Sequence, residues 1–465
     1  MPSLTDQSIH SDLGQLVLQN FLRLAALEPA RSLPNAAIPD LILAASATAR
    51  HEAEPAVLSA SPKRFKLEIR RFNAGNGLGA QRVFETLVQG KAPGDFWLDS
   101  AMVSTLGATR HTQTFVKADH MPFLRTAVPQ KNNHDASPSY SYLGSRAHTL
   151  TYSTETGLAL LNTGKPAKPL ACDAPFFNGL NALQQALAAQ TAFPTAEGGP
   201  DWKAGWVGWM GYGLKSETLP GYGTRKGKER QLGERPDAPD ACLSFVRTVL
   251  ALDHTTSDWL AIGLVEMGSV GHQQGLDGGL GAVLEAEGVR WASTEAEWEM
   301  YLGECEAALA QLEAESRPSQ RPAPTSLPAF VSDFSGADYI DRIGTARDLI
   351  HSGESYELTL TTQFRSTLPA DRTPYDLYLT LRASNPAPYS TFINLPELDV
   401  AVVSSSPERF IKLGKDGTVE MKPIKGTVAR VKGDPVSDEA VKNALQNDRK
   451  EIAENLMVSH PCGPG

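Results

Sequence analysis

The sequence predicts an α+β protein, in which helices and strands are mixed without the regular alternation that builds a parallel sheet. Two observations support this fold class. Short runs of alternating, β-branched or aromatic residues, which favour strands, recur along the chain. Runs with apolar residues three and four positions apart, which favour helices, stand between them at irregular intervals, and glycine or proline ends most runs.

The first part of the chain is expected to hold a helix, a linker and then a strand-rich domain. Within the N-terminal segment 1–27, residues 10–27 have an amphipathic helical pattern, and residues 28–62 have the Ala- and Pro-rich composition of a linker. The elements expected in the domain at 63–316 are a strand at 63–72, a helix at 81–87, strands at 96–98, 140–144, 205–212 and 243–252, and a helix at 296–314.

A Pro- and Ser-rich stretch at 317–333 is the clearest boundary, and a second domain is expected at 334–465. Its first helix is predicted to start at a cap of Ser335 or Asp338 and to stop at Gly353. The residues of the apolar face of this helix are Tyr339, Ile343, Ala346 and Ile350. The elements expected after it are a strand at 356–364, a helix at 375–382, a strand at 389–395, a hairpin of 400–405 with 410–413, and a last helix from a cap at Ser437 to Leu456.

Composition and charge exclude several classes of protein. A chain of 465 residues can bury one or two large cores. Its net charge of −10 argues against nucleic acid as the main partner, because phosphate binding favours a basic surface. We expect no membrane segment and no secretory signal, since no apolar run is long enough to cross a bilayer and the start is polar. The 4 scattered cysteines fit reduced thiols, so we expect a cytoplasmic protein.

The run MKPIKGT at 421–427 is the strongest candidate for a catalytic segment. It reads as a strand end followed by a tight turn, where Gly426 allows close backbone approach and Thr427 offers a hydroxyl and an N–H. A lysine at such a turn, Lys425, can act as a nucleophile when a neighbouring cation or partial burial lowers its pKa. The alternative is a pair of solvated surface lysines beside a β-turn.

Carboxylates follow in two further segments. Glu408 lies in the run SPER at 406–409, directly after a predicted strand, so it can lie beside Lys425 at adjacent strand ends. Glu451 and Glu454 are spaced i, i+3 on one predicted helix and share a face, as carboxylates that bind a hard cation such as Mg²⁺ must. A surface turn with an ion pair, and a solvated helical stripe, are the alternatives.

Taken in order, the motifs of the second domain resemble those of the chorismate-utilising enzymes, specifically component I of the aminodeoxychorismate synthases. The motifs are GESYELT at 353–359, NPAPY at 385–389, SPERF at 406–410, PIKGT at 423–427 and EIAENLM at 451–457. Three earlier runs resemble the N-terminal, anthranilate synthase component I-like domain of that family: FWLDS at 96–100, YSYLG at 140–144 and PDA at 239–241. The resemblance implies the α+β fold of that family, with stacked antiparallel sheets flanked by helices.

The resemblance also implies a reaction. Anthranilate synthases have alanine at the position of Lys425, whereas the aminodeoxychorismate branch has lysine. In that branch the lysine attacks chorismate at C2 and expels the C4 hydroxyl, and ammonia then enters at C4 and expels the lysine. By resemblance, Glu408 is the general acid/base for loss of the hydroxyl, and Gly426 and Thr427 contact the substrate.

Two further sites are implied in the same way. Glu454 resembles a Mg²⁺ ligand, with the metal neutralising a carboxylate of chorismate. Asp99 and Ser100 stand where the family has a tryptophan pocket, so bound tryptophan is a further expectation.

Both ends of the chain depart from the family pattern. The run from Val458 to Gly465 does not continue the family's catalytic segment, so we expect a truncated C-terminal part, an incomplete core and an inactive fragment. Residues 8–22 resemble the tail of a glutamine amidotransferase domain, which in fused forms supplies ammonia from glutamine. Two alternatives stay open: anthranilate synthase component I, which Lys425 disfavours, and a non-catalytic binding fragment.

Overall fold

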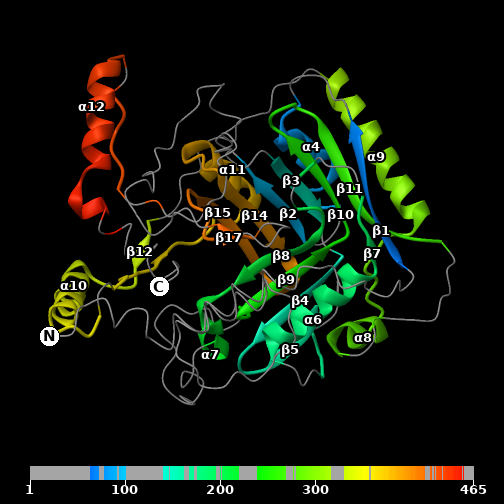
Figure 1. The fold of residues 1–465 in the computed structure, drawn as a ribbon, viewed down its shortest axis with the longest axis horizontal. Helices are drawn as coiled ribbons and strands as arrows, with labels where there is room; N and C mark the ends of the chain where they lie inside the picture. The colour runs from blue at the N-terminus through cyan, green and yellow to red at the C-terminus, as the bar shows by residue number, and fades with distance from the viewer. Residues whose placement is uncertain are drawn as a thin grey trace, which may run out of the picture.

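The fold is described from a computed structural model of the chain. The structure describes residues 63–72, 78–91, 94–100, 140–145, 147–161, 167–171, 175–194, 199–200, 202–218, 238–268, 276, 279–315, 329–355, 358–413, 419–420, 424, 426–431, 433–452 and 454. Two packed β-sheets with helices on their outer faces form the main body, which confirms the predicted α+β class (Figure 1). The helix predicted at 10–27 and the linker at 28–62 lie outside the described residues.

The larger sheet has eight strands in the order β15-β14-β2-β3-β10-β11-β1-β7. Among these strands only the β1–β7 pair is parallel, and the other neighbours are antiparallel. Its strands are β1 (Phe65–Phe72), β2 (Asp95–Asp99), β3 (Tyr140–Ser145), β7 (Thr191–Ala192), β10 (Thr248–Asp253), β11 (Trp259–Glu266), β14 (Tyr389–Leu395) and β15 (Val400–Ser406).

The smaller sheet has five antiparallel strands in the order β6-β5-β4-β9-β8. Its strands are β4 (His148–Ser153), β5 (Gly157–Leu161), β6 (Lys168–Pro169), β8 (Gly205–Met210) and β9 (Ala241–Val246). The other elements in this part are η3 (Tyr212–Leu214) and α7 (Lys215–Thr218) after β8, and η4 (Pro396–Leu398) between β14 and β15. Two short ladders stand apart, β12 (Val331–Ser332) with β13 (Phe364–Arg365) and β16 (Lys412–Leu413) with β17 (Val419–Glu420).

Alternation along the strands divides the apolar side chains between two cores. In β10, Leu250 and Leu252 belong to the core under the helices, whereas Val249 and Ala251 belong to the core between the sheets. The first core is covered by α4 (Ala80–Leu87), α9 (Glu295–Ala314) and α11 (Pro374–Ser384). On the far face of the smaller sheet lie α6 (Phe176–Ala189) and α8 (Gly279–Ala286) (Figure 1).

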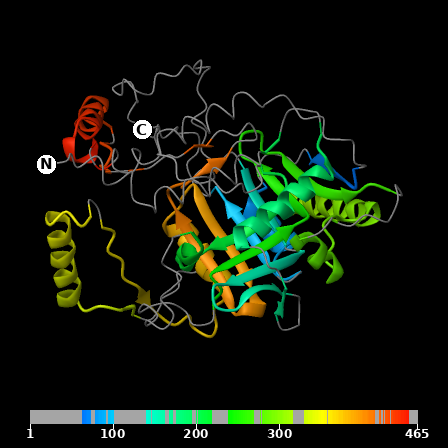
Figure 2. The ribbon, with the colours of Figure 1, turned by 60° about the horizontal axis from the view of Figure 1, so that its bottom comes forward.

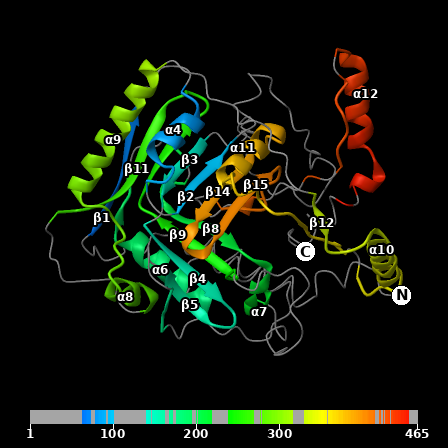
Figure 3. The ribbon, with the colours of Figure 1, turned by 180° about the vertical axis from the view of Figure 1, so that it is seen from behind.

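Two helices of the predicted second domain lie outside these layers. The helix α10 (Gly336–His351) starts at the predicted cap, since the Ser335 side chain accepts from the Asp338 N–H, but neither it nor α12 (Pro435–Gln446) has a buried residue. Both helices lie to one side of the sheets in each view (Figures 1, 2 and 3). The apolar face predicted for α10 is therefore present but uncovered, with Ile343 40% and Ile350 39% exposed.

Several predicted elements differ from those in the structure. The run 243–252 is two strands, β9 and β10, which separate at Arg247 and enter different sheets. In the described part of the run predicted at 356–364, only Phe364 is in a strand. The run at 410–413 pairs with β17 rather than with β15, whose only partner in the described sheets is β14.

The last predicted helix also differs, because it begins earlier than predicted and is interrupted. The side chain of Asp434 caps α12 by accepting from the N–H groups of Val436 and Ser437. The helix ends at Gln446, and a separate helical stretch begins at Arg449.

The boundary predicted at 317–333 does not separate two sheets. Strand β14, from the predicted second domain, pairs with β2 from the first, for example at Phe392 with Trp97. Residues on both sides of the boundary therefore share one sheet and one core. None of the helices in the described residues is both long enough and apolar enough to span a bilayer.

Candidate active site

Glu408 follows β15, and its carboxylate reaches the segment that contains position 425. The hydroxyl of Ser406 donates to the Glu408 carbonyl (3.0 Å) and accepts from the Glu408 N–H (3.4 Å), so a serine turn ends the strand. Beyond this turn, Glu408 Oε1 accepts a hydrogen bond from the backbone N–H of Ile424 (3.0 Å). The carboxylate thus lies beside residue 424, one position before Lys425, which itself lies outside the described residues.

Gly426 lies against the carboxylate of Glu451. Its φ of +69° is in the left-handed region, and a Cβ atom at this position would lie 2.4 Å from Glu451 Oε2 and 2.6 Å from Cδ. Both the backbone conformation and the close approach therefore require glycine here. Thr427, the next residue, is exposed.

Glu451 and Glu454 share one lysine. Lys450 Nζ lies 3.1 Å from Glu451 Oε1 and 3.0 Å from Glu454 Oε1, so the two carboxylates approach the same point, as their i, i+3 spacing predicts. The hydrogen bond to Glu454, followed in size by the one to Glu451, raises the pKa of Lys450 above its usual range. Its side chain is therefore an ammonium at neutral pH.

The second oxygen of Glu451 is suited to a cation. Oε2 is buried and has no hydrogen-bond partner among the described residues. No three His, Cys, Asp or Glu side chains within the described ranges gather into a complete metal site. Magnesium, however, is commonly held by one or two carboxylates together with groups of the substrate. The carboxylates of Glu451 and Glu454 therefore fit such an ion.

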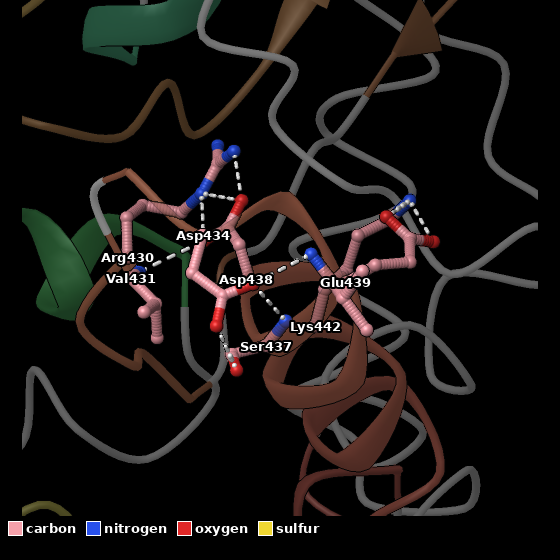
Figure 4. Close-up of polar contacts among 8 residues, drawn as sticks. Arg430, Val431, Asp434, Ser437, Asp438, Glu439 and Lys442 are labelled. Carbon is pink, nitrogen blue, oxygen red and sulfur yellow. Dashed lines mark hydrogen bonds and ion pairs between the residues drawn. The ribbon is translucent and has the colours of Figure 1, made fainter.

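One ion pair and one hydrogen bond connect the segment after Gly426 to α12, the helix that precedes these glutamates. Figure 4 shows the Arg430 guanidinium beside the Asp438 carboxylate, where Arg430 Nε lies 2.8 Å from Oδ1. The Val431 N–H also donates to Asp438 Oδ1 (2.9 Å). The segment after Gly426 is thereby held against the first turn of α12, and this helix leads to Glu451.

Asp99 and Ser100 form part of a different cluster, inside the larger sheet. The Asp99 side chain is fully buried and pairs with the Arg382 Nε of α11, while Asp99 Oδ1 accepts from the Ser141 hydroxyl (2.9 Å). Burial lowers the pKa of Arg382, but the attraction of Asp99, the hydrogen bond to Asp99 and the nearby Tyr378 and Tyr375 together raise it above its usual range. The Ser100 N–H donates to Ser141 Oγ (3.0 Å). Asp99 thus joins two segments that are far apart in sequence.

Proton counting assigns the tautomer of His254 in this cluster. Ser141 has one hydroxyl proton, which it gives to Asp99, and it already accepts from Ser100. At the 2.8 Å contact between Ser141 Oγ and His254 Nε2, the imidazole must therefore donate. Burial lowers the pKa of His254 despite the nearby carboxylates of Asp99 and Asp253, which favours the neutral ring protonated at Nε2.

The structure brings some predicted site residues together and separates others. Glu408 accepts from the Ile424 N–H, Gly426 lies against Glu451, and Glu451 shares Lys450 with Glu454. Asp99 and Ser100 belong to the separate cluster just described. Sequence reasoning missed Lys450, Arg382 and His254. Only Lys450 had a signal, its i, i+4 spacing to Glu454, whereas the other two depend on contacts between distant strands and helices.

Comparison with known proteins identifies the family. The sequence model described as chorismate binding enzyme matches residues 133–460, more than half of the chain. The chain belongs to the chorismate binding enzymes.

Similar proteins include aminodeoxychorismate synthases and an anthranilate synthase component. The chain is 36% identical over 258 residues to the chloroplastic aminodeoxychorismate synthase of Arabidopsis thaliana, covering 56% of this chain and 25% of that protein. It is 30% identical over 392 residues to a probable chloroplastic aminodeoxychorismate synthase of rice, covering 82% and 39%. Anthranilate synthase component 1 of Pseudomonas aeruginosa is 37% identical over 131 residues, covering 28% and 25%. The chain spans about a quarter to two-fifths of the length of these relatives.

A solved structure is also similar. Anthranilate synthase component I from Streptococcus pneumoniae superposes with a TM-score of 0.42 at 19% identity, covering 76% of this chain and 67% of that one.

Proposed function

We propose that this chain carries the site of an aminodeoxychorismate synthase, which aminates chorismate at C4 for the synthesis of p-aminobenzoate and folate. The observation that carries the proposal is the hydrogen bond from the Ile424 N–H to Glu408 Oε1, which brings a carboxylate to the segment of Lys425. Relatives from plants and Streptomyces that are named aminodeoxychorismate synthase support it.

In this proposal Lys425 is the nucleophile. Its amine attacks C2 of chorismate as the C4 hydroxyl leaves, and ammonia then attacks C4 as the lysine leaves, so two displacements replace one difficult substitution. Glu408 delivers a proton to the departing hydroxyl. Its hydrogen bond to the backbone of Ile424 orients the carboxylate for this role. Gly426 and Thr427 contact the substrate.

Magnesium is the proposed cofactor, held by Glu454 and Glu451. The buried, unpartnered oxygen of Glu451 and the shared approach to Lys450 support this ligand pair. When bound, the ion neutralises a carboxylate of chorismate. The absence of a side chain at Gly426 leaves Glu451 room beside the turn.

Covalent labelling tests the reaction. The 465-residue chain is incubated with chorismate, Mg²⁺ and ammonium, and its peptides are examined by mass spectrometry. We expect a chorismate-derived adduct on the peptide containing Lys425, absent in Lys425→Ala, because the first displacement can label the lysine even in a chain that does not turn over. Release of fluorescent anthranilate without a lyase partner would contradict the proposal and favour anthranilate synthase. An adduct on another lysine would contradict the role given to Lys425.

Finer points of the proposal need separate measurements. A glutamine amidotransferase domain or subunit is the proposed source of ammonia, which activity with glutamine and such a partner would test. Binding of tryptophan at Asp99 and Ser100, a cytoplasmic location and the inactivity of the 465-residue chain stay predictions. Turnover by this chain would contradict the last of these without changing the reaction assigned to Lys425.

A further inference from the structure

Lys450 occupies the carboxylate oxygens that the proposed metal needs. Its ammonium lies 3.1 Å from Glu451 Oε1 and 3.0 Å from Glu454 Oε1, while the remaining oxygen of Glu451, Oε2, has no hydrogen-bond partner in the described part of the chain. A carboxylate pair that faces one cation at hydrogen-bond distance is also placed to face another. The ammonium of Lys450 therefore lies where a divalent ion would bind the carboxylates of Glu451 and Glu454.

The lysine can leave this position at little cost. Its side chain is 71% exposed, whereas that of Glu451 is 21% exposed. Exposed ion pairs contribute little to stability, because water screens the charges and two long side chains lose freedom when they pair. A divalent ion carries twice the charge of the ammonium, so it competes well for the same oxygens.

We propose that Lys450 is an intramolecular competitor of the metal, whose ammonium holds the Glu451–Glu454 pair without the ion and is displaced when Mg²⁺ binds. This inference rests on the metal site of the proposed function. It adds a regulatory consequence: Lys450 weakens the affinity for Mg²⁺ and keeps the two carboxylates from repelling each other while the ion is absent. Activity should then follow the Mg²⁺ concentration.

Direct titration of Mg²⁺ tests the proposal without measuring turnover. Calorimetry on the wild-type chain, Lys450→Met and Lys450→Arg measures the dissociation constant for Mg²⁺ alone. Removal of a positive charge close to the ion should tighten binding about three- to tenfold in Lys450→Met, and the gain should shrink in high salt. Lys450→Arg, which keeps the charge, should bind Mg²⁺ as the wild type does.

Lys442→Met is the matched control. Lys442 forms an equivalent helical pair with Glu439 (2.9 Å) on α12, so its loss removes the same charge away from the two ligands and should leave Mg²⁺ affinity unchanged. Equal or weaker binding by Lys450→Met would overturn competition while leaving the metal site intact. No Mg²⁺ binding by any of these proteins would overturn both the inference and the metal site.

Discussion

At the level of single residues, position 426 requires glycine for two separate reasons. Its φ of +69° disfavours any residue with a Cβ, and the space beside it is filled by the Glu451 carboxylate. Gly433, at φ +83°, has the first requirement without the second, because a Cβ added there would meet nothing within 4 Å. The pair therefore separates the backbone cost of a side chain from its effect on Glu451.

We expect both alanine variants, Gly426→Ala and Gly433→Ala, to lower the free energy of unfolding by about 1–2 kcal/mol, the cost of a left-handed conformation. Only Gly426→Ala should also weaken Mg²⁺ binding, by about fivefold or more, because its methyl group moves a proposed ligand. Urea unfolding and calorimetric titration measure the two quantities. Equal Mg²⁺ affinity in both variants would show that Glu451 does not hold the ion.

A single buried carboxyl, that of Asp95, makes the free energy of unfolding depend on pH. Its side chain is buried and Oδ1 has no hydrogen-bond partner in the described part of the chain, while Oδ2 accepts from the Gly90 N–H (2.7 Å). Burial raises the pKa of Asp95 to about 6, which the Gly90 hydrogen bond only partly opposes. The folded state thus holds the Asp95 proton more tightly than the unfolded state, whose pKa is about 4.

This group therefore favours folding below about pH 4, and its contribution is lost as the pH rises through about 6. Asp95→Asn removes the ionisation, so its stability relative to wild type should increase by about 2 kcal/mol between about pH 4 and pH 7. Chemical unfolding at several pH values measures it. A difference between Asp95→Asn and wild type that stays flat over this pH range would refute the prediction.

At the scale of elements, α9 combines signals that sequence reveals with a contact that it hides. Thr294 and Glu297 form a capping box at its start, so the helix predicted at 296–314 was readable from local residues. Its packing depends on Gly263 of β11, where a Cβ would lie 2.4 Å from the Trp298 ring. Nothing near Gly263 in sequence indicates that a tryptophan fills this space.

We expect Gly263→Ala to lower the free energy of unfolding by about 1–3 kcal/mol, because α9 must move away from the sheet to admit one methyl group. Gly303→Ala is the control on α9 itself. It is exposed with open space around its Cβ position, so it should raise stability by up to about 1 kcal/mol. Thermal unfolding compares them, and a neutral Gly263→Ala would mean that the helix does not pack closely here.

The elements that sequence reasoning got wrong share a physical cause. Periodicity found β9 and β10 as one run, because both are apolar on both faces, and only the change of sheet at Arg247 divides them. Turn residues and helical spacing are local, so the sequence could predict that Glu408 follows a strand and that Glu451 and Glu454 approach one point, whereas their roles stay predictions. The partner of Asp99 could not be predicted, because Arg382 reaches it only after β14 pairs with β2.

At the scale of the whole molecule, the pairing of β14 with β2 makes one cooperative unit from two distant segments. Phe392 of β14 packs in the same core as Trp97 of β2, Phe84 of α4 and Tyr378 of α11. Neither α10 nor α12 buries a side chain in any core. Stability should therefore be divided between a shared body and two weakly supported helices.

Hydrogen exchange read by mass spectrometry tests this division. Amides of β2, β10 and β14 should exchange together at the slow rate of global unfolding, whereas those of α10 and α12 should exchange far faster, because only local hydrogen bonds protect them. Phe392→Ala should then speed exchange in β2 as much as in β14, since the cavity weakens the core that both strands share, and should leave α10 unchanged. Faster exchange confined to β14 would mean that the predicted second domain is a separate folding unit. Exchange of α10 at the rate of the sheet would mean that the apolar face of α10 is covered in solution.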